Sequence, residues 1–158
     1  MTPAGTGKVR EVMLTVTGEE TYTDGHKDRT RTRSRAVHEK IPGTGSGKEA
    51  MSAHKFRYRE TDPQSGAVTE SAIGFSNGCG SMERTGLIRT KMQFVPGKET
   101  GCVYDTPFGS IHMTISTQFV TVREVGESFH ARIRYEMTLA GGDPVECAVT
   151  VRAEPVSG

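Results

Sequence analysis

The stretch Phe129-His-Ala-Arg-Ile-Arg-Tyr-Glu-Met-Thr-Leu139 decides the fold, because apolar and polar residues alternate along its whole length. A period of two places the apolar side chains on one face of a β-strand and the polar side chains on the other. The same alternation recurs at residues 110–116 and 145–152. Strands with one apolar and one solvated face, joined by short turns, predict an antiparallel sheet that must close or pack on itself.

Turn signals divide the rest of the chain into further short strands. Asp24-Gly25 and Asn77-Gly78 are strong hairpin signals, and Pro96-Gly97 is another turn. No long segment has a helical period. Turn signals at about 8–12-residue spacing are typical of a barrel or a sandwich. The expected strands are 12–23, 54–59, 68–75, 79–84, 87–95, 101–106, 108–117, 119–125, 128–139 and 145–153.

The fold prediction is therefore all-β, a single antiparallel β-barrel of about 8–10 strands, with a β-sandwich as the alternative. With 158 residues the chain has the length of one domain. We expect residues 1–7 to form a flexible N-terminal tail and residues 8–155 to form the barrel domain. Residues 24–53 are charged and Gly-rich and are expected to form a loop or an irregular hairpin.

Composition favours a cytoplasmic protein without a membrane segment. The net charge is only +1, which argues against a globally basic nucleic-acid-binding protein. Three cysteines, Cys79, Cys102 and Cys147, have no paired spacing, so we expect reduced thiols rather than disulfides or a zinc site. No run of about 18 apolar residues occurs, and the first ten residues lack the apolar core of a signal peptide.

An ordered set of short motifs runs from residue 84 to residue 117. It reads Arg84-Thr-Gly86, Met92-Gln-Phe94, Tyr104-Asp-Thr-Pro-Phe-Gly109 and Ile115-Ser-Thr117. In order and spacing these motifs resemble the YwiB-like family of small bacterial proteins, whose fold is a calycin-type, lipocalin-like β-barrel. The resemblance covers residues 9–23 and 55–153, while the segment between them is longer and more basic than we expect of the family. It implies an architecture but no reaction, so it supplies no catalytic residue.

The residues around Pro107 have a structural interpretation that does not depend on the family. Proline lacks an N–H and must sit at an edge or a corner, and Gly109 permits backbone angles that larger residues resist. We therefore interpret this motif as a corner between two strands. Polar residues near it lie close to strand ends, where a barrel mouth is expected. The candidate ligand-binding residues are Arg84, Arg89, Tyr104 and Thr106.

A row of arginines is the most strongly charged feature. Arg29, Arg31, Arg33 and Arg35 alternate with Thr and Ser. In an extended strand their guanidinium groups project from one face at intervals of about 6.6–6.8 Å. Such a row could contact a partner protein or an RNA backbone, although few aromatic residues accompany it to stack on bases. The other interpretation is an edge strand or a mobile loop, whose like charges discourage pairing with another edge.

The remaining motifs favour no specific chemistry. The Gly-rich stretch at residues 43–48 lacks the spacing and the hydroxyl of a phosphate-binding loop. The five histidines lack metal-ligand spacing, and His112 and His130 fall on polar faces. No G-x-S-x-G elbow occurs. We therefore predict no catalytic residue, no metal and no cofactor.

Three functional hypotheses follow. The first is a non-catalytic protein that binds a small, partly apolar ligand in the barrel, because barrels of about eight strands can enclose one. The second is a protein- or RNA-interaction module that uses residues 29–35, with nucleic acid the less favoured partner. The third is an enzyme whose site is assembled by the fold. A barrel filled by its own side chains would count against the first hypothesis.

Overall fold

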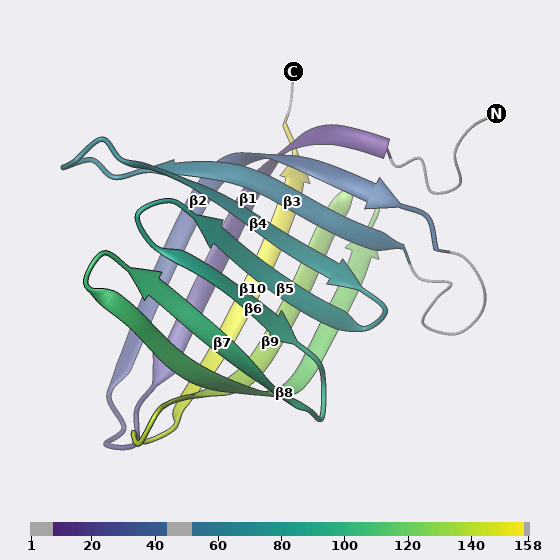
Figure 1. Ribbon diagram of the computed structural model, residues 1–158. Coiled ribbons are helices and arrows are strands. Elements are labelled where there is room, and N and C mark those ends of the chain that lie inside the picture. Colours follow the sequence, from purple (N-terminus) through teal and green to yellow (C-terminus); the bar gives the residue numbers. More distant parts are fainter. Residues whose placement is uncertain (1–7, 44–51, 157–158) are drawn as a thin grey trace.

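The computed structural model describes residues 8–43 and 52–156, which form ten strands joined by turns (Figure 1). The predicted tail at residues 1–7 and most of the Gly-rich stretch at residues 43–48 lie outside the described residues. The strands are β1 (Lys8–Thr21), β2 (Lys27–Ile41), β3 (Ala53–Thr61), β4 (Val68–Ser76), β5 (Cys79–Thr85), β6 (Arg89–Phe94), β7 (Glu99–Thr106), β8 (Gly109–Val125), β9 (Ser128–Leu139) and β10 (Val145–Pro155).

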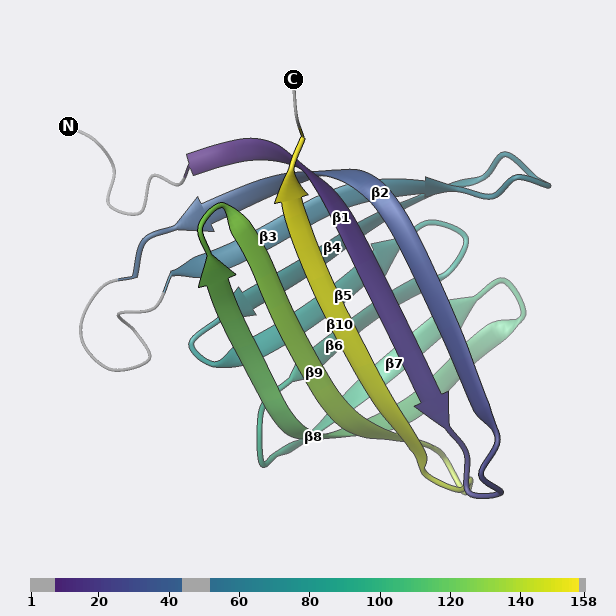
Figure 2. The same cartoon turned by 180° about the vertical axis from the view of Figure 1, so that it is seen from behind.

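The ten strands form one closed antiparallel barrel. Each strand pairs with its neighbours in sequence, and β1 pairs with β10 to complete the circle. The predicted barrel is therefore confirmed, and the alternative of a sandwich is wrong. Figures 1 and 2 show that β3–β7 form one layer, which crosses the layer formed by β1, β2, β9 and β10.

Strand β8 belongs to both layers and bends between them (Figures 1 and 2). We predicted two strands here, but one strand runs from Gly109 to Val125, with a register shift between Thr117 and Phe119. The shift moves the inward-facing side chains from odd to even positions. A bulge of this kind bends a strand without ending it, and in the sequence the change of phase resembles a break.

Strand β2 corrects a second prediction. Residues 24–53 were expected to form a loop or an irregular hairpin, yet Lys27–Ile41 is a continuous strand that pairs with β1 without a register shift. Threonines on the face opposite the arginines are favourable for a strand. Because the strand is exposed for most of its length, its charged side chains remain hydrated, and forming the strand removes little of their solvation.

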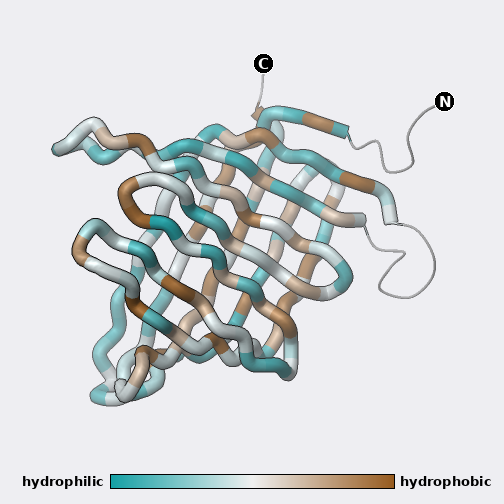
Figure 3. Tube along the Cα trace, in the orientation of Figure 1, coloured by the Kyte–Doolittle hydropathy of each residue, from teal (hydrophilic) through white to brown (hydrophobic). Residues whose placement is uncertain are grey.

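The alternating residues of β9 face the core as predicted. Phe129, Ala131 and Ile133 are each 1% exposed, and Figure 3 shows apolar and polar residues alternating along neighbouring strands. Aromatic rings fill the interior at the end of the barrel where β9 begins. The ring centroid of Phe129 lies 4.8 Å from that of Phe56 and 5.5 Å from that of Phe75. This end of the interior is therefore packed by side chains.

Candidate functional site

The barrel wall separates between β2 and β3. Their ladder has only five residue pairs, from Val37–Arg57 to Ile41–Ala53, whereas β1 and β2 pair from Lys8–Lys40 to Thr21–Lys27. Beyond Val37 the two strands diverge, and the β3–β4 hairpin projects away from β2 (Figure 1). An open groove of about 770 Å³ lies at this divergence. We call it the β2–β3 groove.

The β2–β3 groove combines apolar and charged side chains. Ser34, Ala36, Tyr58 and Ser71 contribute from the inner face of the barrel, and charged residues contribute from the outer face. Four of the charged residues form two ion pairs: Arg35 lies 3.7 Å from Glu11, and Arg59 lies 3.2 Å from Glu70. Within the described residues Lys55 and Arg57 form no ion pair. With four basic and three acidic side chains, the groove has a net charge of +1 beside a partly apolar surface. Its charged residues are Glu11, Arg35, Lys55, Arg57, Arg59, Glu70 and Glu83.

Two of the predicted ligand-binding residues lie on one cross-strand row that starts in this groove. The strand registers connect Tyr58, Ser71, Arg84, Thr90 and Tyr104 in that order across β3–β7. Burial of Tyr58, Ser71 and Thr90 shows that the row faces inward, while Arg84 is exposed. Burial raises the pKa of Tyr58, as does the charge of Glu60, and the charge of Arg84 opposes this.

The other two predicted residues lie elsewhere. Arg89 pairs with Asp105 on the outer face of β6 and is exposed. Thr106 stabilises the turn between β7 and β8: its Oγ1 donates to the carbonyl of Gly109 at 2.8 Å and accepts from the Phe108 N–H at 3.2 Å. The structure therefore does not bring Arg89 and Thr106 together with Arg84 and Tyr104. Gly109 has a φ of 130°, in keeping with its interpretation as a corner residue.

The arginine row lies on the outer face of β2. Arg29, Arg31, Arg33 and Arg35 are exposed, whereas Ala36 and His38, of the opposite parity, are buried. Arg35 also borders the β2–β3 groove. The row is therefore extended and solvent-exposed, and the interpretation as an edge strand describes it better than a mobile loop does.

A polar relay centred on two buried histidines, which the sequence did not suggest, lies at the aromatic end of the barrel. Arg10 Nε donates to His38 Nδ1 at 3.2 Å, and His38 Nε2 lies 2.9 Å from His54 Nδ1. His54 Nε2 is 3.9 Å from Glu124 Oε2, and Lys40 Nζ is 2.8 Å from Glu124 Oε1. We call these five residues the histidine relay.

The direction of proton donation in the relay is fixed at Arg10. A guanidinium group can only donate, so His38 Nδ1 accepts and His38 carries its proton on Nε2. That N–H in turn donates to His54 Nδ1, which places the proton of His54 on Nε2, facing Glu124. Both rings are therefore neutral and in the same tautomer.

Burial explains why both histidines stay neutral. His38 is 2% exposed and His54 is 3% exposed. Burial, supported by the neighbouring His54 ring and the charge of Arg10, lowers the pKa of His38 to about 4. Burial also lowers the pKa of His54, although Glu124 opposes the shift. Partial burial raises the pKa of Glu124, but the hydrogen bond from Lys40 and the nearby histidines outweigh it, and the net shift is downward.

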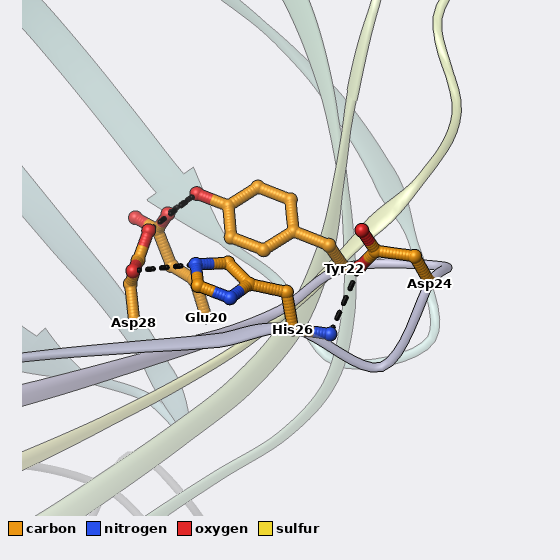
Figure 4. Close-up of polar contacts among 5 residues, drawn as sticks. All are labelled: Glu20, Tyr22, Asp24, His26 and Asp28. Atoms are coloured by element: carbon orange, nitrogen blue, oxygen red, sulfur yellow. Dashed lines mark hydrogen bonds and ion pairs between the residues drawn. The ribbon is translucent and has the colours of Figure 1, made fainter.

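An exposed polar cluster closes the β1–β2 hairpin at the opposite end of the barrel (Figure 4). The Tyr22 hydroxyl lies 2.8 Å from Glu20 Oε2 and 3.1 Å from Asp28 Oδ2. His26 Nε2 lies 3.0 Å from Asp28 Oδ1, and the His26 N–H donates to Asp24 Oδ1. The hydrogen bond to Glu20 raises the pKa of Tyr22. These contacts hold the turn and fix the register in which β2 leaves it.

No metal centre is evident in residues 8–43 and 52–156, where no three His, Cys, Asp or Glu side chains gather to hold an ion. In the same residues there is no helix of the length and apolar character needed to cross a membrane.

Comparison with known proteins identifies the family. The solved structure of the ywiB protein from Bacillus subtilis matches with a TM-score of 0.76 and 19% sequence identity, over 96% of each chain. This similarity shows a shared fold and confirms the resemblance seen in the sequence. No curated protein matches the chain. The model of the family described as "Domain of unknown function (DUF1934)" matches residues 25–151. The chain belongs to the DUF1934 family.

Proposed function

We propose that the chain is a non-catalytic binding protein that takes a small, partly apolar anion in the β2–β3 groove. The observation that carries the proposal is the early end of the β2–β3 ladder, which leaves a groove of about 770 Å³ in the barrel wall. Ligand sites typically occupy about 300–1,000 Å³ and combine apolar surface with a few polar groups. The sequence analysis favours a ligand inside the barrel. Aromatic side chains fill the interior at one end, so the groove is the better position.

The chemistry of the groove supports an anionic ligand. Ala36, Val37 and Tyr58 offer apolar contacts. Lys55 and Arg57 offer positive charges that form no ion pair among the described residues, and the lining as a whole has a net charge of +1. A carboxylate or sulfonate between them would form charge-assisted hydrogen bonds, which contribute about 1.5–3 kcal/mol each. The cross-strand row that begins with Tyr58 and Ser71 in the groove continues to Arg84 on β5.

The cell compartment is part of the same proposal. The cysteines at positions 79, 102 and 147 are free. Free thiols support a reducing compartment, and we place the protein in the cytoplasm.

The dye 8-anilinonaphthalene-1-sulfonate is a suitable probe because it joins an aromatic body to a sulfonate. We expect the dye to bind saturably at one site, and fluorescence titration measures this binding. Replacing Lys55→Glu and Arg57→Glu together is expected to weaken binding at least tenfold. Tenfold corresponds to about 1.4 kcal/mol, which is no more than the loss of one charge-assisted hydrogen bond of about 1.5–3 kcal/mol.

The matched control changes two basic residues on a neighbouring strand. Arg89 and Lys91 are exposed on the outer face of β6 and do not line the groove. The double variant Arg89→Glu with Lys91→Glu has the same net charge as the groove variant and should bind the dye as the wild type does. Equal weakening in both variants, or no saturable binding to the wild type, would contradict the proposal.

A further inference from the structure

Strand β2 has a free edge along most of its length. It pairs with β1 from Lys27 to Lys40, but with β3 only from Val37 onward. Among the described strands none pairs with the other side of β2 between Lys27 and Ala36. Figure 2 shows this part of β2 at the margin of the near layer. The backbone of ten residues therefore has a strand on one side only.

The hydrogen-bonding pattern between β1 and β2 shows which backbone groups of β2 point toward its free edge. The Tyr22 N–H donates to the His26 carbonyl at 2.9 Å, and bonds between two antiparallel strands recur at every second residue. The β1–β2 register has no shift, so the even-numbered residues of β2 bond to β1. The odd-numbered residues direct their N–H and C=O groups to the free edge. Among residues 27–36 these are Lys27 and the arginines at positions 29, 31, 33 and 35.

The side chains on this edge are positively charged and mostly unpaired. Arg35 lies 3.7 Å from Glu11, whereas Arg29, Arg31 and Arg33 form no ion pair within the part of the chain that the structure describes. Across the ladder, Arg31 and Arg33 lie opposite Thr17 and Thr15. The edge thus presents free hydrogen-bonding groups and positive charges at the same residues.

We propose that the free edge of β2 binds an extended acidic segment of a partner protein as an added β-strand. Main-chain hydrogen bonds would supply affinity, and alternate side chains would supply specificity. Alternate residues of a strand share one face, so acidic residues at every second position of the segment would lie beside Arg29, Arg31 and Arg33. The inference does not rest on the proposed function, because these three arginines do not line the β2–β3 groove.

Two other occupants fit this edge less well. A second copy of the chain, pairing β2 with β2, would bring two arginine rows together, and like charges at an edge oppose such pairing. A nucleic acid would meet the charges but has no backbone groups that match a row of free N–H and C=O. Residues 27–36 also provide no aromatic side chain for base stacking.

The test uses a labelled peptide, Glu-Thr-Glu-Thr-Glu-Thr-Glu, with blocked ends. We expect fluorescence anisotropy to show binding that weakens as salt rises. A peptide with the same composition in the order Glu-Glu-Glu-Glu-Thr-Thr-Thr should bind at least tenfold more weakly, because fewer of its charges share a face. Methylating alternate backbone nitrogens of the alternating peptide, in both phases, should weaken binding in one phase only, since one set of N–H groups faces β2.

Two triple variants with the same net charge distinguish binding at the free edge of β2 from a general attraction to positive charge. Replacing Arg29, Arg31 and Arg33 with Gln should weaken peptide binding at least tenfold. Replacing Arg132, Arg134 and Arg152 with Gln should leave it unchanged, because β9 and β10 are paired on both sides. The first variant should also bind 8-anilinonaphthalene-1-sulfonate as the wild type does. Failure of dye binding alone therefore overturns the proposed function and leaves this inference standing.

Amide hydrogen exchange reports the added strand directly. We expect the peptide to slow the exchange of the backbone amides of Arg29, Arg31 and Arg33 at least tenfold, while the even-numbered amides of β2 are already protected in the free protein. Peptide binding without this protection would overturn the inference. So would equal binding of the two peptide orders, or tighter binding of an oligouridylate that is lost in the same arginine variant, which would point to a nucleic acid.

Discussion

Replacing Phe129 with alanine is expected to lower the free energy of unfolding by about 3–5 kcal/mol, the usual cost of removing a buried ring. Phe129 is 1% exposed. Its ring centroid lies 4.6 Å from that of His54, 4.8 Å from that of Phe56 and 5.5 Å from that of Phe75. Strands on all sides are held by ladder hydrogen bonds, so the cavity cannot easily collapse. Urea denaturation followed by far-UV circular dichroism measures the loss.

The matched control is the same substitution at an exposed phenylalanine. Phe108 is 100% exposed in the turn between β7 and β8, and Phe108→Ala should change the free energy of unfolding by no more than about 0.5 kcal/mol. If Phe129→Ala does not fold, Phe129→Leu removes less volume and should fold with a smaller loss. A similar loss at both positions, or no loss at Phe129, would contradict the packing described for this end of the barrel.

The sequence predicted the faces of the strands better than their partners. The alternate apolar residues of β9 at positions 129–137 and of β10 at positions 145–153 lie on the inward face, whereas Leu139 at the end of β9 is exposed. Parity alone cannot show which strands meet, because any two amphipathic strands can pair. The closure of β1 on β10 joins residues from opposite ends of the chain, such as Val12 and Pro155. Only the family resemblance indicated a closed barrel over a sandwich.

The prediction for β2 was wrong because its charged residues resemble a loop, and the prediction for β8 was wrong because its alternation of apolar residues changes from odd to even positions. The arginines of β2 suggested a loop, although the alternating threonines and serine carried strand information. Where β2 has no partner strand on its free edge, both of its faces are exposed, so it can carry charged side chains on one face and small polar side chains on the other. Arg31 and Thr32, on opposite faces, are both exposed. The groove that results from this gap depends on where the β2–β3 ladder ends, which no local pattern encodes.

The histidine relay could not be predicted because four strands assemble it. Arg10 comes from β1, His38 and Lys40 from β2, His54 from β3 and Glu124 from β8. Metal-ligand spacing was the wrong criterion for residues that hydrogen-bond to one another. One signal was present in the sequence: His54 shares the parity of Phe56 and Tyr58, which marks it as inward-facing. Searching for polar residues on apolar faces would have found it.

Acidification is expected to destabilise the fold through these histidines. The pKa of His38 is about 4 in the folded protein, against an ordinary value of 6.5. Because the folded pKa is the lower one, the unfolded chain takes up the proton first. The contribution of neutral His38 is therefore complete above pH 6.5 and is lost as the pH falls toward 4. At about 1.36 kcal/mol per pKa unit the loss reaches about 3 kcal/mol, and His54, whose pKa is also lowered, adds to it.

The double variant His38→Leu with His54→Leu isolates this effect from the titration of surface carboxylates. We expect its free energy of unfolding to change much less between pH 6.5 and pH 4.5 than that of the wild type. His112→Gln removes an exposed histidine that lies outside the histidine relay and should retain the wild-type profile. Nitrogen-15 NMR of the folded wild type should show protons on Nε2 of both buried rings at pH 6. Rings that titrate near pH 6.5 in the folded protein, or an equally steep profile in the double variant, would show that the relay does not control acid stability.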